Sequence, residues 1–215
     1  MIKIQPIVKE IIFKELEAYI ALTEDYMNMS SYAHKIRPTV EMITKKKVTI
    51  TSLVVSLSRI KKELKKQKPL IRDVVIKNIT TKLPLTELVY ENNNEFIEEI
   101  GTLYKKILIS RDDFFITTTS INEINIFISS NLSSRVLKHF SHKPKILNEN
   151  LAAVGVSLSS ENFDIPNTFF SLLSVTARAN INIEELISTS TELIFIVKEK
   201  DFSSTVDLFA KLYKK

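Results

Sequence analysis

The chain has 215 residues, 30 of them basic and 25 acidic, with two glycines and neither cysteine nor tryptophan. Without cysteine, a disulfide framework, a thiolate zinc site, an iron–sulfur cluster and a cysteine nucleophile are all excluded. Gly101 and Gly155 are far apart, whereas a phosphate-cradling loop needs several clustered glycines. The hydrophobic fraction of 44% is normal for a chain that buries a core.

The N-terminal segment is apolar but not continuously so. Lys9, Glu10 and Lys14 interrupt it, which argues against a signal peptide. No window approaches the roughly 20 apolar residues of a membrane span. We therefore expect a soluble, cytoplasmic protein without a membrane partner.

The charge is unevenly placed along the chain. Residues 1–70 contain 14 Lys/Arg and 7 Asp/Glu, a net charge of +7, while residues 71–215 contain 16 and 18, a net charge of −2. A basic segment on a near-neutral body favours a polyanion partner. A solvated basic helix face would explain the same charge equally well.

Helices are expected in the basic segment. Apolar residues at helical spacing predict a helix over 7–20. Ser30 or Ser31 can cap a short helix that ends near Arg37. Pro38 then fits the first turn of a further helix, because its missing N–H is not needed there.

The last helix of this segment is predicted over 51–66, with Thr49 or Thr51 as its cap. It carries an apolar stripe of Leu53, Leu57, Ile60 and Leu64 and several basic residues off the stripe. Residues 73–80 alternate as a strand. Three helices followed by a strand are typical of a winged helix-turn-helix, but a three-helix module that only dimerises has the same outline. The candidate DNA-binding residues are Lys45, Lys46, Lys47, Arg59, Lys62 and Lys65.

The remaining chain alternates short strands and helices. The order of elements repeats in two halves, about 82–148 and 149–215, and is of the ferredoxin-like βαββα kind. It predicts an α+β fold in which an antiparallel sheet is covered on one side by helices. The predicted strands are 83–90, 114–120, 123–129, 150–159 and 183–198 with a break near Thr191, and the predicted helices are 93–108, 131–140, 166–179 and 202–213.

Two stretches carry a resemblance to a known family. The sequence ANINIEELISTSTELIFIV at 179–197 resembles the regulatory ACT domain of the aspartokinase type, as does NLAAV at 150–154 followed by Pro166 and a helix. The stretches SSYAHKIRPTVE and KKKVTITSLVVSLSRIKKEL resemble the head of a small group of short ACT proteins, which is winged-helix-like. The resemblance implies a winged-helix-like module over 1–80 and tandem ferredoxin-like (ACT) βαββαβ units over 81–148 and 149–215.

The resemblance also implies amino-acid sensing. In such domains the effector sits where two ACT units meet, near the loop after the first strand. The start of the first helix can hold an α-carboxylate. Glu185 can then accept the ammonium group, and Ser188 and Ser190, two residues apart on the expected strand, can offer hydroxyls from one face. Asn167 stands where the family usually has glycine, and its side chain can narrow the site. The implied effector-binding residues are Asp164, Pro166, Asn167, Asn182, Glu185, Ser188 and Ser190.

No catalytic motif accompanies these residues. The kinase domain of an aspartokinase is absent, and the first 70 residues are too short and too poor in glycine to cradle ATP. His139 and His142 are three apart but have no third ligand cluster beside them in the sequence. We expect no catalytic residue, no cofactor and no metal.

Together these features predict a non-catalytic regulator that responds to an amino acid, pairs as a homodimer and has DNA as a candidate partner. Two alternatives remain open. One is a regulatory subunit that docks on an amino-acid biosynthetic enzyme. The other is a structural dimerisation module without a ligand.

Overall fold

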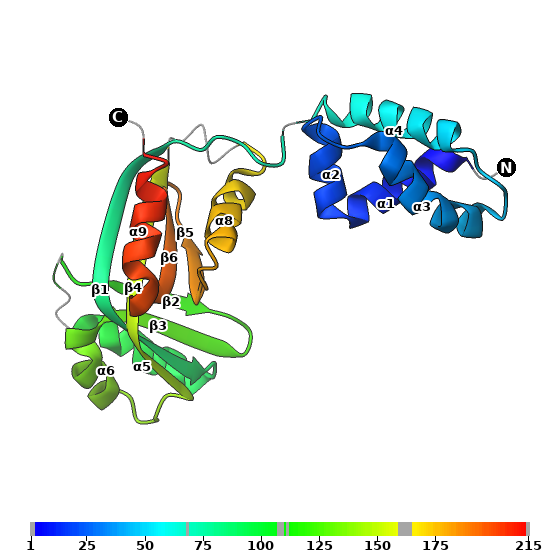
Figure 1. Cartoon of the computed structure of the whole chain (residues 1–215). Coiled ribbons are helices and arrows are strands. Elements are labelled where there is room, and N and C mark those ends of the chain that lie inside the picture. The colour runs from blue at the N-terminus through cyan, green and yellow to red at the C-terminus, as the bar shows by residue number, and fades with distance from the viewer. Residues whose placement is uncertain (1–2, 68, 107–109, 111, 159–164, 214–215) are drawn as a thin grey trace. The chain divides into compact units, whose positions relative to one another are not determined.

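The computed structural model describes residues 3–67, 69–106, 110, 112–158 and 165–213. They form two compact units, Met1–Arg72 and Asp73–Lys215 (Figure 1). No helix in these ranges is long and apolar enough to cross a membrane.

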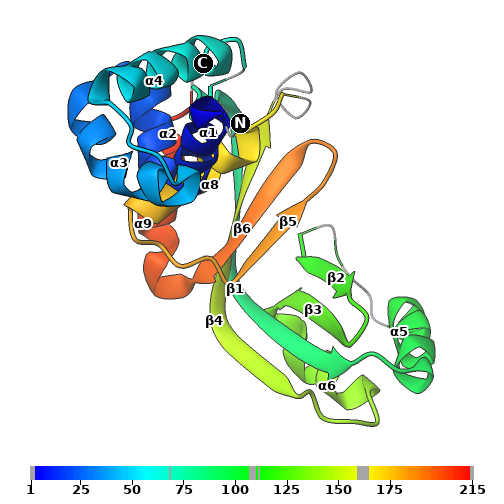
Figure 2. The ribbon, with the colours of Figure 1, turned by 90° about the vertical axis from the view of Figure 1, so that its right-hand side faces the viewer.

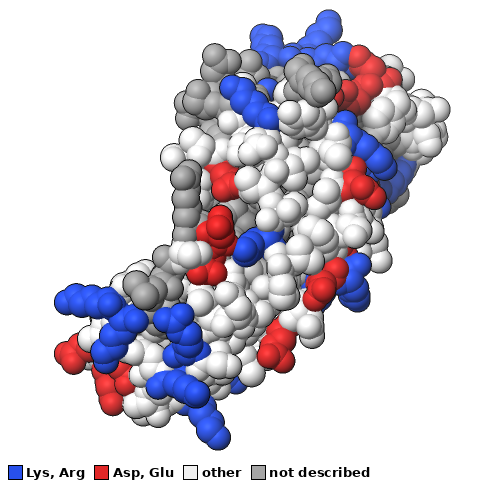
Figure 3. Space-filling view, turned by 90° about the vertical axis from the view of Figure 1, so that its left-hand side faces the viewer, with Lys and Arg blue, Asp and Glu red and all other residues white. Residues whose placement is uncertain are grey.

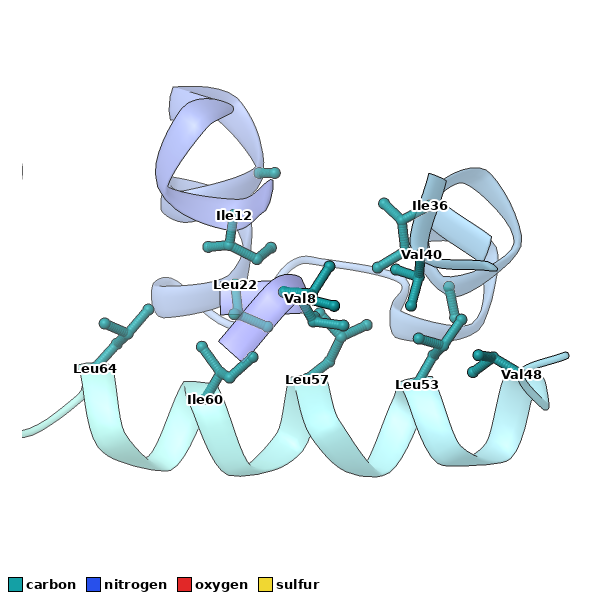
Figure 4. Close-up of a cluster of buried hydrophobic side chains, with 13 residues drawn as sticks. Val8, Ile12, Leu22, Ile36, Val40, Val48, Leu53, Leu57, Ile60 and Leu64 are labelled. Carbon is teal, nitrogen blue, oxygen red and sulfur yellow. The ribbon is translucent and has the colours of Figure 1, made fainter. Parts of the chain in front are cut away.

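The first unit contains helices α1 (Ile4–Lys14), α2 (Leu16–Thr23), α3 (Met29–Thr44) and α4 (Ile50–Leu64). The predicted stripe on α4 is confirmed, since all four of its residues are buried. They pack against Val8, Ile12, Leu22, Ile36 and Val40 of the other three helices (Figure 4). The periodic apolar face of α4 thus organises the core of this unit.

Several helix boundaries differ from the prediction. The helix expected over 7–20 is divided at Glu15, whose backbone is extended (φ −109°, ψ 98°). α3 continues through Pro38, which lies on an exposed face where water can satisfy the carbonyl left without a partner. Asn28, and not Ser30 or Ser31, caps α3 by accepting the Ser31 N–H. Thr49, one of the two predicted candidates, caps α4.

The second unit is built on one six-stranded sheet with the order β2-β3-β1-β4-β6-β5, in which every neighbouring pair is antiparallel. Helices α5 (Asn94–Lys106), α6 (Ser133–His139) and α8 (Thr168–Arg178) connect the strands, α9 (Phe202–Ala210) follows the last strand, and 3₁₀ turns precede α6 and α9. The strands are β1 (Ile76–Glu91), β2 (Phe115–Thr119), β3 (Glu123–Ser129), β4 (Ile146–Leu158), β5 (Glu185–Ser188) and β6 (Glu192–Lys198).

The strands predicted over 73–80 and 83–90 are one long strand, β1. Its first half pairs with β4, as in Ile79 opposite Val156. Its second half pairs with both β4 and β3, as in Leu88 opposite Ile126. The strand expected to complete a winged helix beside the first helices therefore belongs to the sheet of the second unit. The winged-helix outline is not confirmed.

The predicted repetition of elements is present, and the two halves share strands. β1, α5, β2, β3, α6 and β4 form one βαββαβ arrangement. β4, α8, β5, β6 and α9 form another, and the start of β1 supplies its last strand. Positions 80/81 and 148/149, the predicted domain boundaries, lie inside the two shared strands.

Alternate residues of the strands point to opposite faces of the sheet and pack into different hydrophobic cores. On β3, Ile126 and Ile128 pack with α5 and α6, while Phe127 points to the helix-free face. On β6, Phe195 packs with α9, while Ile194 and Ile196 join Phe127. The centre of the helix-free face is buried because the sheet curls, and Figure 2 shows both edge hairpins on the same side of the long strands.

Candidate functional site

The start of α8 has the unusual backbone that its sequence suggested. Asn167 caps this helix in the left-handed region (φ 71°), which asparagine tolerates better than most residues. Its carbonyl accepts hydrogen bonds from the N–H and the hydroxyl of Ser171, each 2.9 Å long. Pro166 directly precedes it, and Asp164 lies outside the described residues.

The two serines expected on one strand face do not share one. Ser188 is the last residue of β5, whereas Ser190 lies in the turn to β6. Thr189 closes this turn: its hydroxyl accepts the N–H of Glu192, and its own N–H donates to the Glu192 carbonyl. The alternation argument is wrong for Ser190 because the strand ends before it.

The register of the sheet divides the predicted effector residues between two ends. Ser188 is opposite Leu193, and Glu192 is opposite Ser157 near the end of β4, from which the chain leads to α8. Glu185 is opposite Ile196, at the other end of the hairpin. α8 runs back along the sheet and leads into Asn182 and Glu185. The structure thus places Pro166 and Asn167 toward the end with Ser188 and Ser190, and Asn182 and Glu185 at the opposite end.

Asn182 and Glu185 are engaged in local hydrogen bonds. The Asn182 amide donates to Oε1 of Glu184 at 2.8 Å, and Lys198 Nζ lies 3.7 Å from the other carboxylate oxygen of Glu184. A carboxylate oxygen of Glu185 accepts the N–H of Leu186 at 3.2 Å. Sequence reasoning missed Glu184, whose partner Lys198 becomes visible only through strand pairing.

A pocket on the helix-free face of the sheet was also missed. It has a volume of 230 Å³ and is lined by β1, β4, β6 and the segment before β2. Its charged residues are Lys82, Asp112, Asp113 and Glu192. Lys82 Nζ donates to the backbone carbonyl of Asp112 at 2.5 Å. The pocket was invisible in the sequence because its walls come from four separate segments.

This pocket combines both signs of charge. The N–H of Ser110 donates to Asp113 at 2.9 Å and lowers the pKa of that carboxyl group, with a smaller effect from the charge of Lys82. One ammonium group and three carboxylates can receive the two ends of a zwitterion. The chemistry of the pocket therefore suits a small molecule that carries a carboxylate and an ammonium group.

The second unit also has a basic end. Lys and Arg side chains gather over α5 and α6 (Figure 3). The last turns of these helices carry Lys105, Lys106 and Lys138. The total charge of this unit is near neutral, but the charge in the last turns of α5 and α6 is locally positive.

The six predicted DNA-binding residues fall into separate groups. Lys46, Lys47 and Arg59 line one pocket of the first unit together with Lys3, and Lys45 ends α3 next to it. Lys62 is exposed on α4 and does not line the pocket. Lys65 and Lys61 both pair with Asp25, and their hydrogen bonds lower the pKa of that carboxyl group. DNA contact stays a prediction.

One group of potential metal ligands lies in the second unit. Glu95 and Glu99 of α5 and His142 bring ligand atoms within 4.8 Å of one another. His139, the expected neighbour of His142, instead contacts the Thr102 hydroxyl and the Glu99 carbonyl through Nε2. Glu95 and His142 are exposed, and no second feature of the group points to a bound ion. The expectation of no metal therefore stays a prediction.

No protein-family model and no curated protein sequence matches the chain. Solved structures do. Aspartate kinase of Clostridium acetobutylicum is 15% identical with a TM-score of 0.53 over 67% of this chain and 36% of that one. The ligand-free regulatory subunit of aspartate kinase from Thermus thermophilus is 10% identical with a TM-score of 0.52 over 65% of this chain and 100% of that one. E. coli aspartokinase III, in complex with aspartate and ADP, is 16% identical with a TM-score of 0.51 over 65% and 34%.

The resemblance to aspartokinase regulatory (ACT) regions is thus confirmed at the level of the fold. The chain covers the whole of the Thermus subunit but only about a third of the two complete kinases. The matches cover 65–67% of this chain, and the second unit also makes up about two thirds of it. The fold of the second unit is therefore of the kind found in the regulatory regions of aspartate kinases.

Proposed function

We propose that the chain is a non-catalytic regulator whose second unit binds a small amino acid. The carrying observation is that a separate regulatory subunit of an aspartate kinase shares the fold over its whole length. This match supports a regulatory role for the second unit. The mixed charge of the pocket on the sheet supports an amino acid as the ligand.

In this proposal the pocket on the sheet holds the amino acid. Lys82 pairs with the carboxylate of the ligand, and Glu192 or Asp113 accepts its ammonium group. The start of α8, with Pro166, Asn167, Ser188 and Ser190, is the alternative position, where helix N–H groups would hold the carboxylate. Asn182 and Glu185 lie at the opposite end of the β5–β6 hairpin and are not part of this second position.

The regulation that we propose is a change between two arrangements of a homodimer. An effector shifts such an equilibrium only by its difference in affinity for the two states. The partner that reads the change is a biosynthetic enzyme, as the likeness to a separate regulatory subunit favours. The basic first unit suggests DNA as the alternative partner, in which case the protein would be a DNA-binding regulator.

A thermal-shift panel of the twenty amino acids on the full chain tests the sensing function. An amino acid at 100 times its dissociation constant should raise the free energy of unfolding by about 2.7 kcal/mol. Lys82→Gln and Glu192→Gln should abolish that gain if the ligand lies on the sheet. Ser188→Ala and Ser190→Ala should abolish it if the ligand lies at the start of α8. A flat panel would instead favour a structural dimerisation module.

A further inference from the structure

The turn between α3 and α4 forms a cationic pocket in the first unit. The pocket has a volume of 360 Å³, and Lys3, Lys46, Lys47 and Arg59 line it. None of its lining residues is acidic among the residues that the structure describes. Four cations therefore surround one hollow, a different kind of site from the mixed-charge pocket of the second unit.

The local structure holds these lysines in place. Lys45 takes the left-handed conformation (φ 53°) and reverses the chain at the end of α3. Glu41 fixes the outer side of the turn, because its carboxylate accepts the Val48 N–H at 2.8 Å and Arg37 Nε at 3.0 Å. Thr49 then caps α4. The hydrogen bonds of Glu41 and Thr49 fix the turn between α3 and α4, so the backbone that carries Lys46 and Lys47 is ordered.

The first turn of α1 adds to the positive potential. Its residues Ile4 and Gln5 line the pocket, its cap Lys3 makes no side-chain capping bond, and no acidic residue lies in that turn. The N-terminus of a helix carries a partial positive charge and unpaired N–H groups. The packing of Val8 and Leu57 in the shared core holds this end of α1 beside α4. The helix end thus strengthens a site that the four side chains already define.

The four cations of the pocket form no ion pair among the described residues, unlike several other basic residues of the unit. Lys9, Lys35, Arg37, Lys61 and Lys65 each form an ion pair with a carboxylate. Within the described part of the chain, no such ion pair includes Lys3, Lys46, Lys47 or Arg59. Lys47 is only near enough to Glu41 to help lower the pKa of that carboxyl group. Converging like charges repel each other, and a bound anion would remove that repulsion.

We propose that this pocket binds a phosphate or diphosphate group. Arg59 offers a planar fork that matches two phosphate oxygens, and the lysines add point charges around it. The group can belong to a free phosphorylated molecule or to the backbone of a nucleic acid. Either source presents the same chemistry to the pocket.

The test is a titration of the full chain with inorganic pyrophosphate and, separately, with duplex DNA, both at constant ionic strength. At least one of the two should bind, and Arg59→Gln and Lys46→Gln should each weaken it about tenfold or more. Lys62→Gln is the matched control, since it removes one charge from the exposed side of the same unit and should change affinity less than twofold. Pyrophosphate binding would identify a small phosphorylated ligand, and DNA binding alone would identify a nucleic acid.

The proposal is overturned if neither probe binds, or if Lys62→Gln weakens binding as much as Arg59→Gln does. A thermal melt of each variant separates loss of binding from loss of fold, and Lys46→Gln alters an exposed turn residue and no helix. The amino-acid panel is independent of this result. It can succeed while pyrophosphate and DNA fail, and the reverse.

Discussion

The hydroxyl of Thr80 donates a 2.5 Å hydrogen bond to the carboxylate of Glu192, which lies 112 residues later in the chain. Gly155 stands between their strands, paired with Thr80 on one side and Ile194 on the other. A Cβ at this position would lie 2.2 Å from Oε1 of Glu192 and 2.3 Å from Oγ1 of Thr80. Gly155 is thus required by the close approach of two side chains, since its φ is not positive.

We expect Gly155→Ala to lower the free energy of unfolding by about 1–3 kcal/mol, because the added methyl group displaces the Thr80–Glu192 pair. Urea denaturation measures the change. Gly101→Ala is the control: a Cβ there meets nothing within 4 Å, so at this exposed position of α5 it should stabilise by about 0.5–1 kcal/mol. Adding Glu192→Ala should recover part of the loss, and strict additivity of the two changes would contradict the explanation.

Leu57→Ala should destabilise the first unit by about 2–5 kcal/mol, because Leu57 is fully buried at the centre of the α4 stripe. Val55 lies two residues away and is 44% exposed, so Val55→Ala should change stability by less than about 0.5 kcal/mol. The unfolding transition of each unit is followed by amide hydrogen exchange. Equal effects of the two substitutions would show that α4 does not pack as described.

Tyr90 should make the second unit sensitive to alkaline pH. Tyr90 is 2% exposed, its ring stacks on Phe96 with the ring centroids 4.2 Å apart, and its hydroxyl has no hydrogen-bond partner among the described residues. Burial, helped by the charge of Glu99, raises the pKa of Tyr90 to about 12. An unfolded tyrosine has a pKa of about 10, so between pH 10 and 12 the unfolded chain releases the Tyr90 proton more readily than the folded chain does. The free energy of unfolding is therefore unaffected by Tyr90 below about pH 10 and falls between pH 10 and 12.

Tyr90→Phe tests this assignment. It should remove the Tyr90 part of the alkaline loss and, at pH 7, raise the free energy of unfolding by about 1 kcal/mol, because a buried unpaired hydroxyl disappears. Tyr26→Phe, at a position that is 66% exposed, should leave stability at pH 7 within about 0.5 kcal/mol. A lower stability of Tyr90→Phe at pH 7 would mean that the hydroxyl is bonded in solution.

Asn167→Gly and Asn167→Ala remove the same side-chain amide but differ in backbone freedom. Since φ is 71° at this position, alanine should be less stable than glycine by about 1 kcal/mol. Chemical denaturation of the two variants measures the difference directly. Equal stabilities would show that the start of α8 does not hold the left-handed conformation.

The candidate site residues could be listed from the sequence by residue type, but their grouping in space could not. Lys46, Lys47 and Arg59 were predicted as DNA contacts together with Lys45, Lys62 and Lys65, and the structure places these three around one pocket with Lys3, while Lys62 and Lys65 do not line it. Ser188 and Ser190 were grouped by strand alternation, which failed because β5 ends at Ser188 and the turn begins at Thr189. Local patterns identify residue types, but they do not place a strand end to within one residue.

The sequence by itself determined the features that depend on neighbours along the chain. These include the buried stripe of α4, the Thr49 cap, the alternation of strands and helices, and the absence of glycine-rich and cysteine chemistry. Only the tertiary structure decided that residues 76–91 form one strand shared by two halves, and that Lys82, Asp113 and Glu192 line one pocket. The physical reason is that these features depend on strand pairing between distant segments, whose register is set by the burial of both sheet faces.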